Sequence, residues 1–179
     1  MSRALRGLLA RRQLAGKADS LRLVLAPLAL LQLAELVPVL EELSRGGGIR
    51  TPYLTVTPPL SEPWIIALSG LWAAAALASL LGWRPRISVP LLALLHLGAL
   101  LYDRQLYSNH FFLLTLLLLL LAAAELTSGG GRPKAGASPS GEGRTVAGWP
   151  LLLMRTQLTS VYLFAGLSKI NPDFLAGRV

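Results

Sequence analysis

Residues 149–177 read WPLLLMRTQLTSVYLFAGLSKINPDFLAG, and this stretch decides how the rest of the chain is interpreted. It is long enough to cross a membrane, because about 20 predominantly apolar residues span the hydrocarbon core. It also contains Arg155, Gln157 and Lys169, although a charged side chain inside a bilayer costs at least about 2.5–3.5 kcal/mol. We therefore expect a membrane span whose polar residues have a specific place.

Five residues of this segment recur at steps of four, three, four and three, which puts them on one helix face: Arg155, Thr159, Tyr162, Gly166 and Lys169. The other faces carry apolar residues that suit lipid: Leu153, Val161, Leu163 and Phe164. We expect this polar seam to face the interior of a helix bundle. Gln157 lies about 200° around the helix from Arg155, so only one of the two can share the seam, and we favour Arg155. Alternatively, Lys169 only anchors the helix at the membrane interface.

Composition places the whole chain in a membrane. Of its 179 residues, 53% are hydrophobic and 15% are charged, against about 25% charged residues in soluble domains. The net charge of +8 does not indicate nucleic-acid binding, because the basic residues lie between the apolar runs, as topology signals do. With no cysteine and two histidines, we expect no metal site. The lipid bilayer is the predicted partner.

The apolar runs predict an all-α, polytopic transmembrane bundle of about five spans, with four regions along the chain. These are a basic cytoplasmic segment (1–20), spans one to four (21–125), a flexible cytoplasmic linker (126–148) and the fifth span (149–179). Within the second region, the spans are expected at about 21–43, 63–83, 87–102 and 109–125. The linker prediction rests on its glycines, prolines and serines.

Polar residues in the earlier spans have competing interpretations. Residues 1–19 could form an amphipathic helix on the inner leaflet or a targeting peptide. Arg22 could snorkel to the interface or support the bundle. Glu35 lies about 20 Å along the same helix, in the outer half of the bilayer, where it needs a partner or water. His96 is expected to be a neutral histidine that is hydrogen-bonded to a neighbouring helix.

The distribution of lysine and arginine predicts the topology. Residues 1–22, the 84–86 turn and the 126–148 linker hold 11 of them, whereas the loops on the alternate side hold 3. The positive-inside rule then places the N-terminus in the cytoplasm. His110 begins the fourth span and Lys169 ends the fifth, so both lie at the outer boundary, close in depth to Glu35.

Three motifs resemble the vitamin K-dependent γ-carboxylase-like family, whose members carry an HTTM domain. The most specific lies in the fifth span: Arg155-x-Gln157, then Tyr162-Leu163-Phe164-Ala165-Gly166, then Lys169-Ile170-Asn171-Pro172-Asp173-Phe174-x-x-Gly177. The other two are Leu21-Arg22-Leu23, at the start of span one, and Asn109-His110-Phe111-Phe112-Leu113, at the start of span four. The resemblance covers most of the chain.

The resemblance implies a reaction and a set of residues. Lys169 matches the lysine that deprotonates vitamin K hydroquinone in the carboxylase, and His110 matches a histidine of the same site. We assign quinol contacts to Asn109, Tyr162 and Glu35, and structural roles to the three polar residues Arg22, Arg155 and Gln157. The implied cofactor is a reduced quinone, vitamin K hydroquinone or menaquinol, and the implied substrate is a protein or peptide glutamate.

The chain also departs from the carboxylase pattern. Ser168-Lys169 stands where the carboxylase has two lysines, and Phe174 stands for its tryptophan. Family members continue with further spans, so we expect a truncated or reduced form of the domain. Three hypotheses follow: a quinol-linked enzyme of the plasma membrane, a non-catalytic family member that acts in export, immunity or complex assembly, and a transporter. The transporter is the weakest, because the spans show no internal repeat.

Overall fold

The computed structural model describes residues 12–14, 16–46, 50–52, 58–128 and 145–170, and the structural statements below refer to these ranges. They form five α-helices: α2 (Gly16–Ser44), α3 (Glu62–Leu80), α4 (Pro85–Tyr102), α5 (Asn109–Leu126) and α6 (Gly148–Ser168). The remaining elements are a 3-10 turn, η1 (Arg104–Leu106), and two three-residue strands, β1 (Arg12–Leu14) and β2 (Thr145–Ala147).

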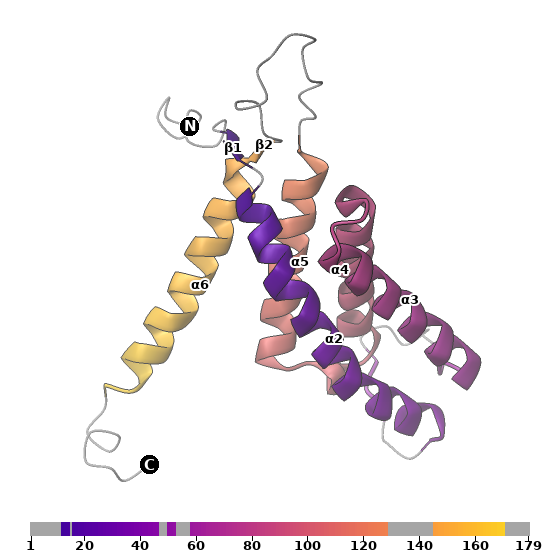
Figure 1. Ribbon diagram of the computed structural model, residues 1–179. Helices are drawn as coiled ribbons and strands as arrows, with labels where there is room; N and C mark the ends of the chain where they lie inside the picture. The colour runs from indigo at the N-terminus through magenta and orange to yellow at the C-terminus, as the bar shows by residue number, and fades with distance from the viewer. Residues whose placement is uncertain (1–11, 15, 47–49, 53–57, 129–144, 171–179) are drawn as a thin grey trace.

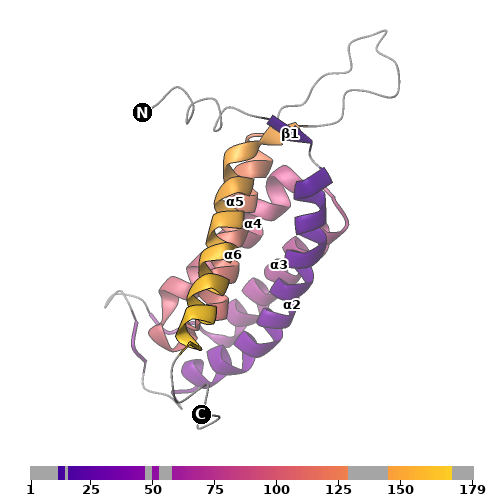
Figure 2. The same ribbon diagram turned by 90° about the vertical axis from the view of Figure 1, so that its left-hand side faces the viewer.

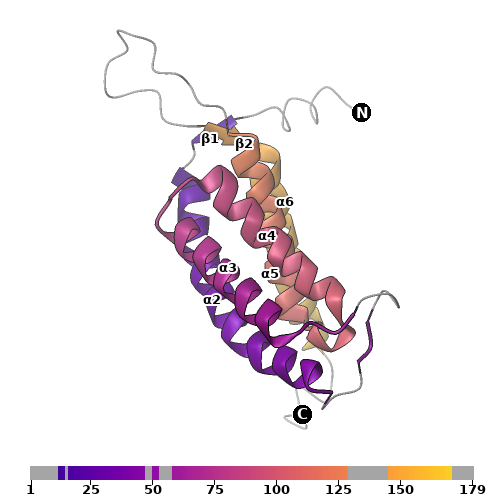
Figure 3. The same cartoon turned by 90° about the vertical axis from the view of Figure 1, so that its right-hand side faces the viewer.

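The first four helices form a bundle, and α6 joins it from one side (Figure 1). α2 packs on α3 and α5, and α4 packs between α3 and α5 (Figure 3). α6 runs antiparallel to α5 and contacts it near the end where β1 and β2 lie. Below that contact, α6 and α2 diverge, so their far ends are well separated (Figure 1).

The predicted fold class is confirmed. Four helices in the described ranges are long and apolar enough to cross a membrane: α2, α3, α4 and α5. Their bounds follow the expected spans closely, except that α2 begins earlier, at Gly16. The expected fifth span also forms a helix, α6, of 21 residues, but it is not among the four. Its central run of arginine, threonine, glutamine and serine residues lowers its mean hydropathy.

The core of the bundle consists of leucine and alanine with a few aromatic rings. Small residues such as Ala29 on α2 and Ala76 on α3 are fully buried and allow the backbones to approach, as is typical of membrane helices. Trp72 of α3 donates its indole N–H to the Ala29 carbonyl oxygen at 3.1 Å, which ties α3 to α2. Phe111 of α5 is fully buried 6.5 Å from the Trp72 ring.

His96 of α4 completes this aromatic cluster in a way that differs from the prediction. The side chain is fully buried, with its ring centroid 4.2 Å from that of Trp72 and 5.2 Å from that of Phe111. Within the described part of the chain, neither ring nitrogen has a hydrogen-bond partner. The expected hydrogen bond to a neighbouring helix is therefore wrong, and His96 is held by ring contacts.

The two short strands correct the interpretation of both the N-terminal segment and the linker. β1 and β2 pair antiparallel, with Gln13 opposite Val146. Residues 12–14 are thus extended rather than part of an amphipathic helix, and residues 145–147 belong to a paired strand rather than to a flexible linker. Residues 1–11 and 129–144, where the rest of these two predictions falls, lie outside the described ranges. The pairing fixes the start of α6 next to the start of α2.

Candidate functional site

Glu35 and His110 meet in a groove between α2 and α5. The Glu35 Oε2 atom lies 3.9 Å from the His110 Nε2 atom, and both side chains are 69% exposed. Gln32, one turn before Glu35, donates from its side-chain nitrogen to the same carboxylate oxygen at 3.3 Å. The groove holds a cavity of about 340 Å³ that is otherwise lined by leucines of the two helices. Polar groups from two spans therefore converge on one apolar cavity.

The start of α5 sets the orientation of His110. Ser108 is the N-cap residue, and its hydroxyl oxygen accepts a hydrogen bond from the Phe111 backbone N–H at 3.3 Å. The same hydroxyl lies 3.2 Å from the His110 Nε2 atom. An unprotonated Nε2 can accept the hydroxyl proton, whereas a protonated Nε2 can donate towards Ser108 or Glu35. His110 can therefore either accept or donate a hydrogen bond at this cavity.

Asn109 lies beside His110 in the first turn of α5. Its side-chain oxygen accepts a hydrogen bond from the Tyr107 hydroxyl at 3.3 Å. Asn109 is exposed and is not among the residues that line the cavity in the described ranges. Its amide oxygen is therefore engaged with the preceding loop.

The polar seam of α6 is exposed rather than directed into the bundle. Only the first turns of α6 are buried, at Gly148, Pro150, Leu151 and Met154, and from Arg155 onwards no described residue is buried. Tyr162 is 75% exposed. The expectation that the seam faces the bundle interior is therefore wrong. The cause is the divergence of α6 from the bundle, which leaves most of the helix after Met154 exposed.

One side of α6 nevertheless faces α2. Leu151, Arg155 and Leu158 line a cavity of about 260 Å³ together with residues of the first turns of α2. At helical spacing, the same side continues to Tyr162 and Lys169. The helical spacing therefore assigns Tyr162 and Lys169 to this α2-facing side of α6, and Figure 2 views the molecule from the side on which α6 and α2 lie.

Lys169 is the C-cap residue of α6, and its backbone N–H bonds to the Gly166 carbonyl oxygen at 3.1 Å. Because α5 and α6 are antiparallel, the end of α6 and the start of α5 lie at the same end of the molecule (Figure 1). The helices have diverged there, and Lys169 is not among the described residues that line the α2–α5 cavity. The structure thus brings Glu35 and His110 together, and places Lys169 at the same end on a separate helix.

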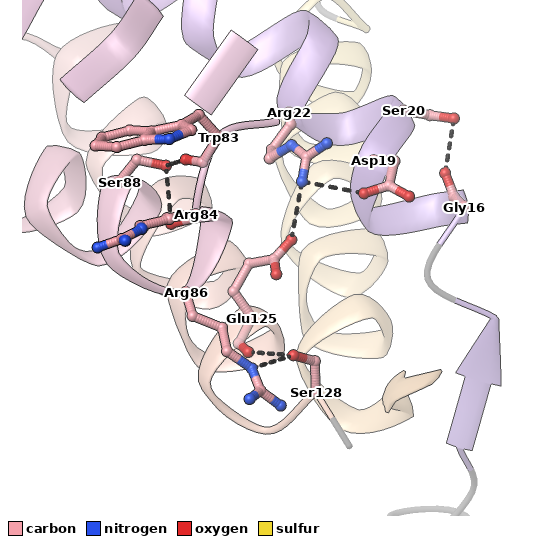
Figure 4. Close-up of polar contacts among 10 residues, drawn as sticks. All are labelled: Gly16, Asp19, Ser20, Arg22, Trp83, Arg84, Arg86, Ser88, Glu125 and Ser128. Carbon is pink, nitrogen blue, oxygen red and sulfur yellow. Dashed lines mark hydrogen bonds and ion pairs between the residues drawn. The ribbon is translucent and has the colours of Figure 1, made fainter. Parts of the chain in front are cut away.

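The three predicted structural residues have different surroundings. Arg22 is buried at 8% exposure, with its guanidinium 3.1 Å from the Asp19 carboxylate and 3.7 Å from the Glu125 carboxylate (Figure 4). Arg155 is exposed at the edge of the α2–α6 cavity, and Gln157 is half-buried. Of the two interpretations of Arg22, its burial favours support of the bundle, whereas the expectation that Arg155 faces the bundle interior is wrong.

Glu125 is a residue that the sequence reasoning missed. It follows the leucine run of α5, and no role of its own was assigned to it from the sequence. In the structure, it is fully buried and pairs with Arg22. The topology offered a signal, because an acid at the inner end of one span and an arginine at the inner end of another lie at one depth. An acid at the end of a long apolar run is therefore a candidate ion-pair partner.

These features define a polytopic α-helical membrane protein with a polar site between its first and fourth spans. The family model for the HTTM domain matches residues 28–179, and the chain belongs to that membrane-associated family. Comparison with curated proteins gave no match, and neither did comparison with solved structures.

Proposed function

We propose that this protein carries out quinol-linked chemistry of the carboxylase type, with Lys169 as the base and His110 as its partner. The observation that carries the proposal is the Glu35–His110 pair, which lines a membrane cavity at the end of the bundle where α6 delivers Lys169. An apolar cavity with a few convergent polar groups is the usual form of a small-molecule site. The residues present fit an aromatic ring that bears hydroxyl groups.

Each residue has a distinct part in this scheme. Lys169 takes a proton from a quinol hydroxyl in this scheme, which a neutral amine can do. His110 accepts or donates a hydrogen bond at the ring oxygen, and Glu35 orients the imidazole. Asn109 and Tyr162 supply further polar contacts. When bound, the reduced quinone and oxygen would supply the strong base that removes a glutamate γ-proton before CO₂ adds.

Lys169 reaches the cavity in this scheme when α6 swings towards α2. The natural chain contains no cysteine, so a single introduced pair reports this movement without background. Leu31, which lines the α2–α5 cavity, and Gly166, on the polar seam of α6, make a suitable pair. We expect L31C/G166C to form a disulfide in membranes more readily when quinol is present.

The proposal is tested by quinol-dependent epoxide formation in membranes that contain the protein, with vitamin K hydroquinone and menaquinol as probes. We expect Lys169→Ala to abolish the activity and His110→Ala to reduce it. Lys169→Arg should also be inactive, because a guanidinium does not deprotonate in proteins. Arg45→Gln, at an exposed cation paired with Glu41, is the matched control and should retain activity. An active Lys169→Arg variant would show that residue 169 only anchors the helix.

A second candidate function is a non-catalytic role in export, immunity or complex assembly. The observation that favours it is the exposure of α6, whose polar and apolar faces are both available to a partner. Absence of epoxide formation with both quinols, together with co-purification of a partner that Tyr162→Ala removes, would support this function. For either function, we propose a plasma-membrane location with the β1–β2 end in the cytoplasm and, for the enzyme, a peptide glutamate as substrate.

A further inference from the structure

We propose that the cavity between the starts of α2 and α6 binds an anionic phospholipid. In this site, Lys17 and Arg155 contact the phosphate and the apolar residues of the cavity hold an acyl chain. The site lies at the opposite end of the bundle from the Glu35–His110 pair and is independent of the proposed reaction.

The lining of this cavity matches the two parts of a lipid. The polar part comes from Lys17 and Ser20 of α2 and from Arg155 of α6. The apolar part consists of Leu21, Leu151, Met154 and Leu158. At 1.5 Å per residue, Leu158 lies about 15 Å along α6 from Gly148, so the apolar lining follows the helix into the membrane. The cavity, at about 260 Å³, is smaller than typical ligand pockets of about 300–1,000 Å³, and a slender chain suits it better than a bulky ligand.

Two other cavities do not share this chemistry. The α2–α5 cavity contains the acidic Glu35, and a cavity among α2, α3 and α4 has no charged residue among the described residues of its lining. In the part of the chain that the structure describes, the α2–α6 cavity is lined by two cations and no acid. Basic pockets between membrane helices on the cytoplasmic side are the pattern by which anionic lipid headgroups are bound.

The contrast between Arg22 and Arg155 supplies a second argument. Both lie near the same end of the bundle, but Arg22 is compensated by the carboxylates of Asp19 and Glu125. Within the described ranges, no hydrogen bond or ion pair joins Arg155 to a protein acceptor. A charge at membrane depth needs an anionic partner or water, and a lipid phosphate meets that need here.

The position of the α2–α6 cavity in the membrane favours a lipid, rather than free phosphate, as the source of the phosphate group. This end carries the start of α2, the α3–α4 turn and the strand pair (Figure 1). The sequence assigns 11 lysine and arginine residues to this side, which places it at the negatively charged cytoplasmic leaflet. A cavity on that side therefore borders a leaflet that contains anionic phospholipids.

The test uses the full chain in nanodiscs of phosphatidylcholine with or without phosphatidylglycerol, followed by extraction and native mass spectrometry of retained lipid. We expect retained phosphatidylglycerol, and an approximately fivefold loss of its occupancy in Arg155→Gln, as for one basic residue near an anionic surface. Lys17→Gln should also lower the occupancy, because Lys17 is the second cation in the lining. Arg155→Lys should keep most of the binding, which shows that the site still folds.

The control is Arg84→Gln. Arg84 is an exposed cation at the same end of the bundle that lies over the Trp83 ring and does not line the cavity. It should leave the occupancy unchanged. Equal retention of phosphatidylcholine, or an equal loss in Arg84→Gln, would overturn the proposal. An excess of inorganic phosphate should not displace the lipid, and displacement would mean that the cavity is a site for free phosphate instead.

Discussion

Arg22 and Arg155 belong to two regions with opposite packing, although the sequence presents them alike. Each is an arginine near the end of a helix where the sequence predicts the cytoplasmic side, and each belongs to a motif that resembles the family. Arg22 lies where α2, α5 and the α3–α4 turn meet, and it is buried with carboxylates on two sides. Arg155 lies on α6, in which only residues of the first two turns are buried. Periodicity identifies a polar face, but the presence of a buried acid at the same depth decides whether that face is inside.

The largest expected effect on stability is at the ion pairs of Arg22 with Asp19 and Glu125. Arg22→Leu leaves the fully buried Glu125 without its cation, and breaking a buried ion pair costs about 3–5 kcal/mol. We expect a loss in the free energy of unfolding of this order, measured by SDS titration in mixed micelles. The double variant Arg22→Leu/Glu125→Leu should recover much of the loss, because no buried charge remains. Equal stability of the single and double variants would show that the pair is not coupled.

A smaller effect is expected at Gly82, which packs on the same arginine. A side chain at position 82 would place its Cβ atom 3.2 Å from the Arg22 Nη2 atom, and the backbone φ angle is +71°. Residues other than glycine rarely adopt such an angle, so Gly82→Ala should cost about 1 kcal/mol or more. The matched control is Gly70→Ala in α3, where a Cβ atom meets nothing within 4 Å. The control should be neutral or stabilising, and equal costs at both glycines would contradict the close contact with Arg22.

The helices could be predicted because hydrophobic runs of membrane length depend on local composition. The starts of α5 and α6 agree with the sequence to within one residue, helped by the Ser108 cap and the apolar run after Gly148. The β1–β2 pair could not be predicted, because it joins residues 12–14 to residues 145–147 across most of the chain. Such a pairing is decided by tertiary contacts and not by three-residue patterns.

The candidate site, too, could be predicted only in part. The depth of Glu35 and His110 followed from counting residues along their spans, and the two side chains do lie within 3.9 Å. The exposure of the α6 seam did not follow, because a helical face can be read from sequence whereas the neighbour that covers it cannot. The shared role of His110 and Lys169 stays a prediction.

The smallest expected effect is at Arg155, and it is the sharpest test of the comparison. Because Arg155 is exposed, Arg155→Leu should change the free energy of unfolding in lipid-free mixed micelles by no more than about 0.5 kcal/mol. A loss close to that of Arg22→Leu would mean that Arg155 has a buried protein partner and that α6 packs along its full length. In nanodiscs with phosphatidylglycerol, the same variant should lose stability relative to the natural chain, because a ligand that binds only the folded state stabilises it. A loss of stability that is seen in phosphatidylglycerol nanodiscs but not in micelles would therefore show that the partner of Arg155 is a lipid. The partners of Arg22, by contrast, belong to the protein.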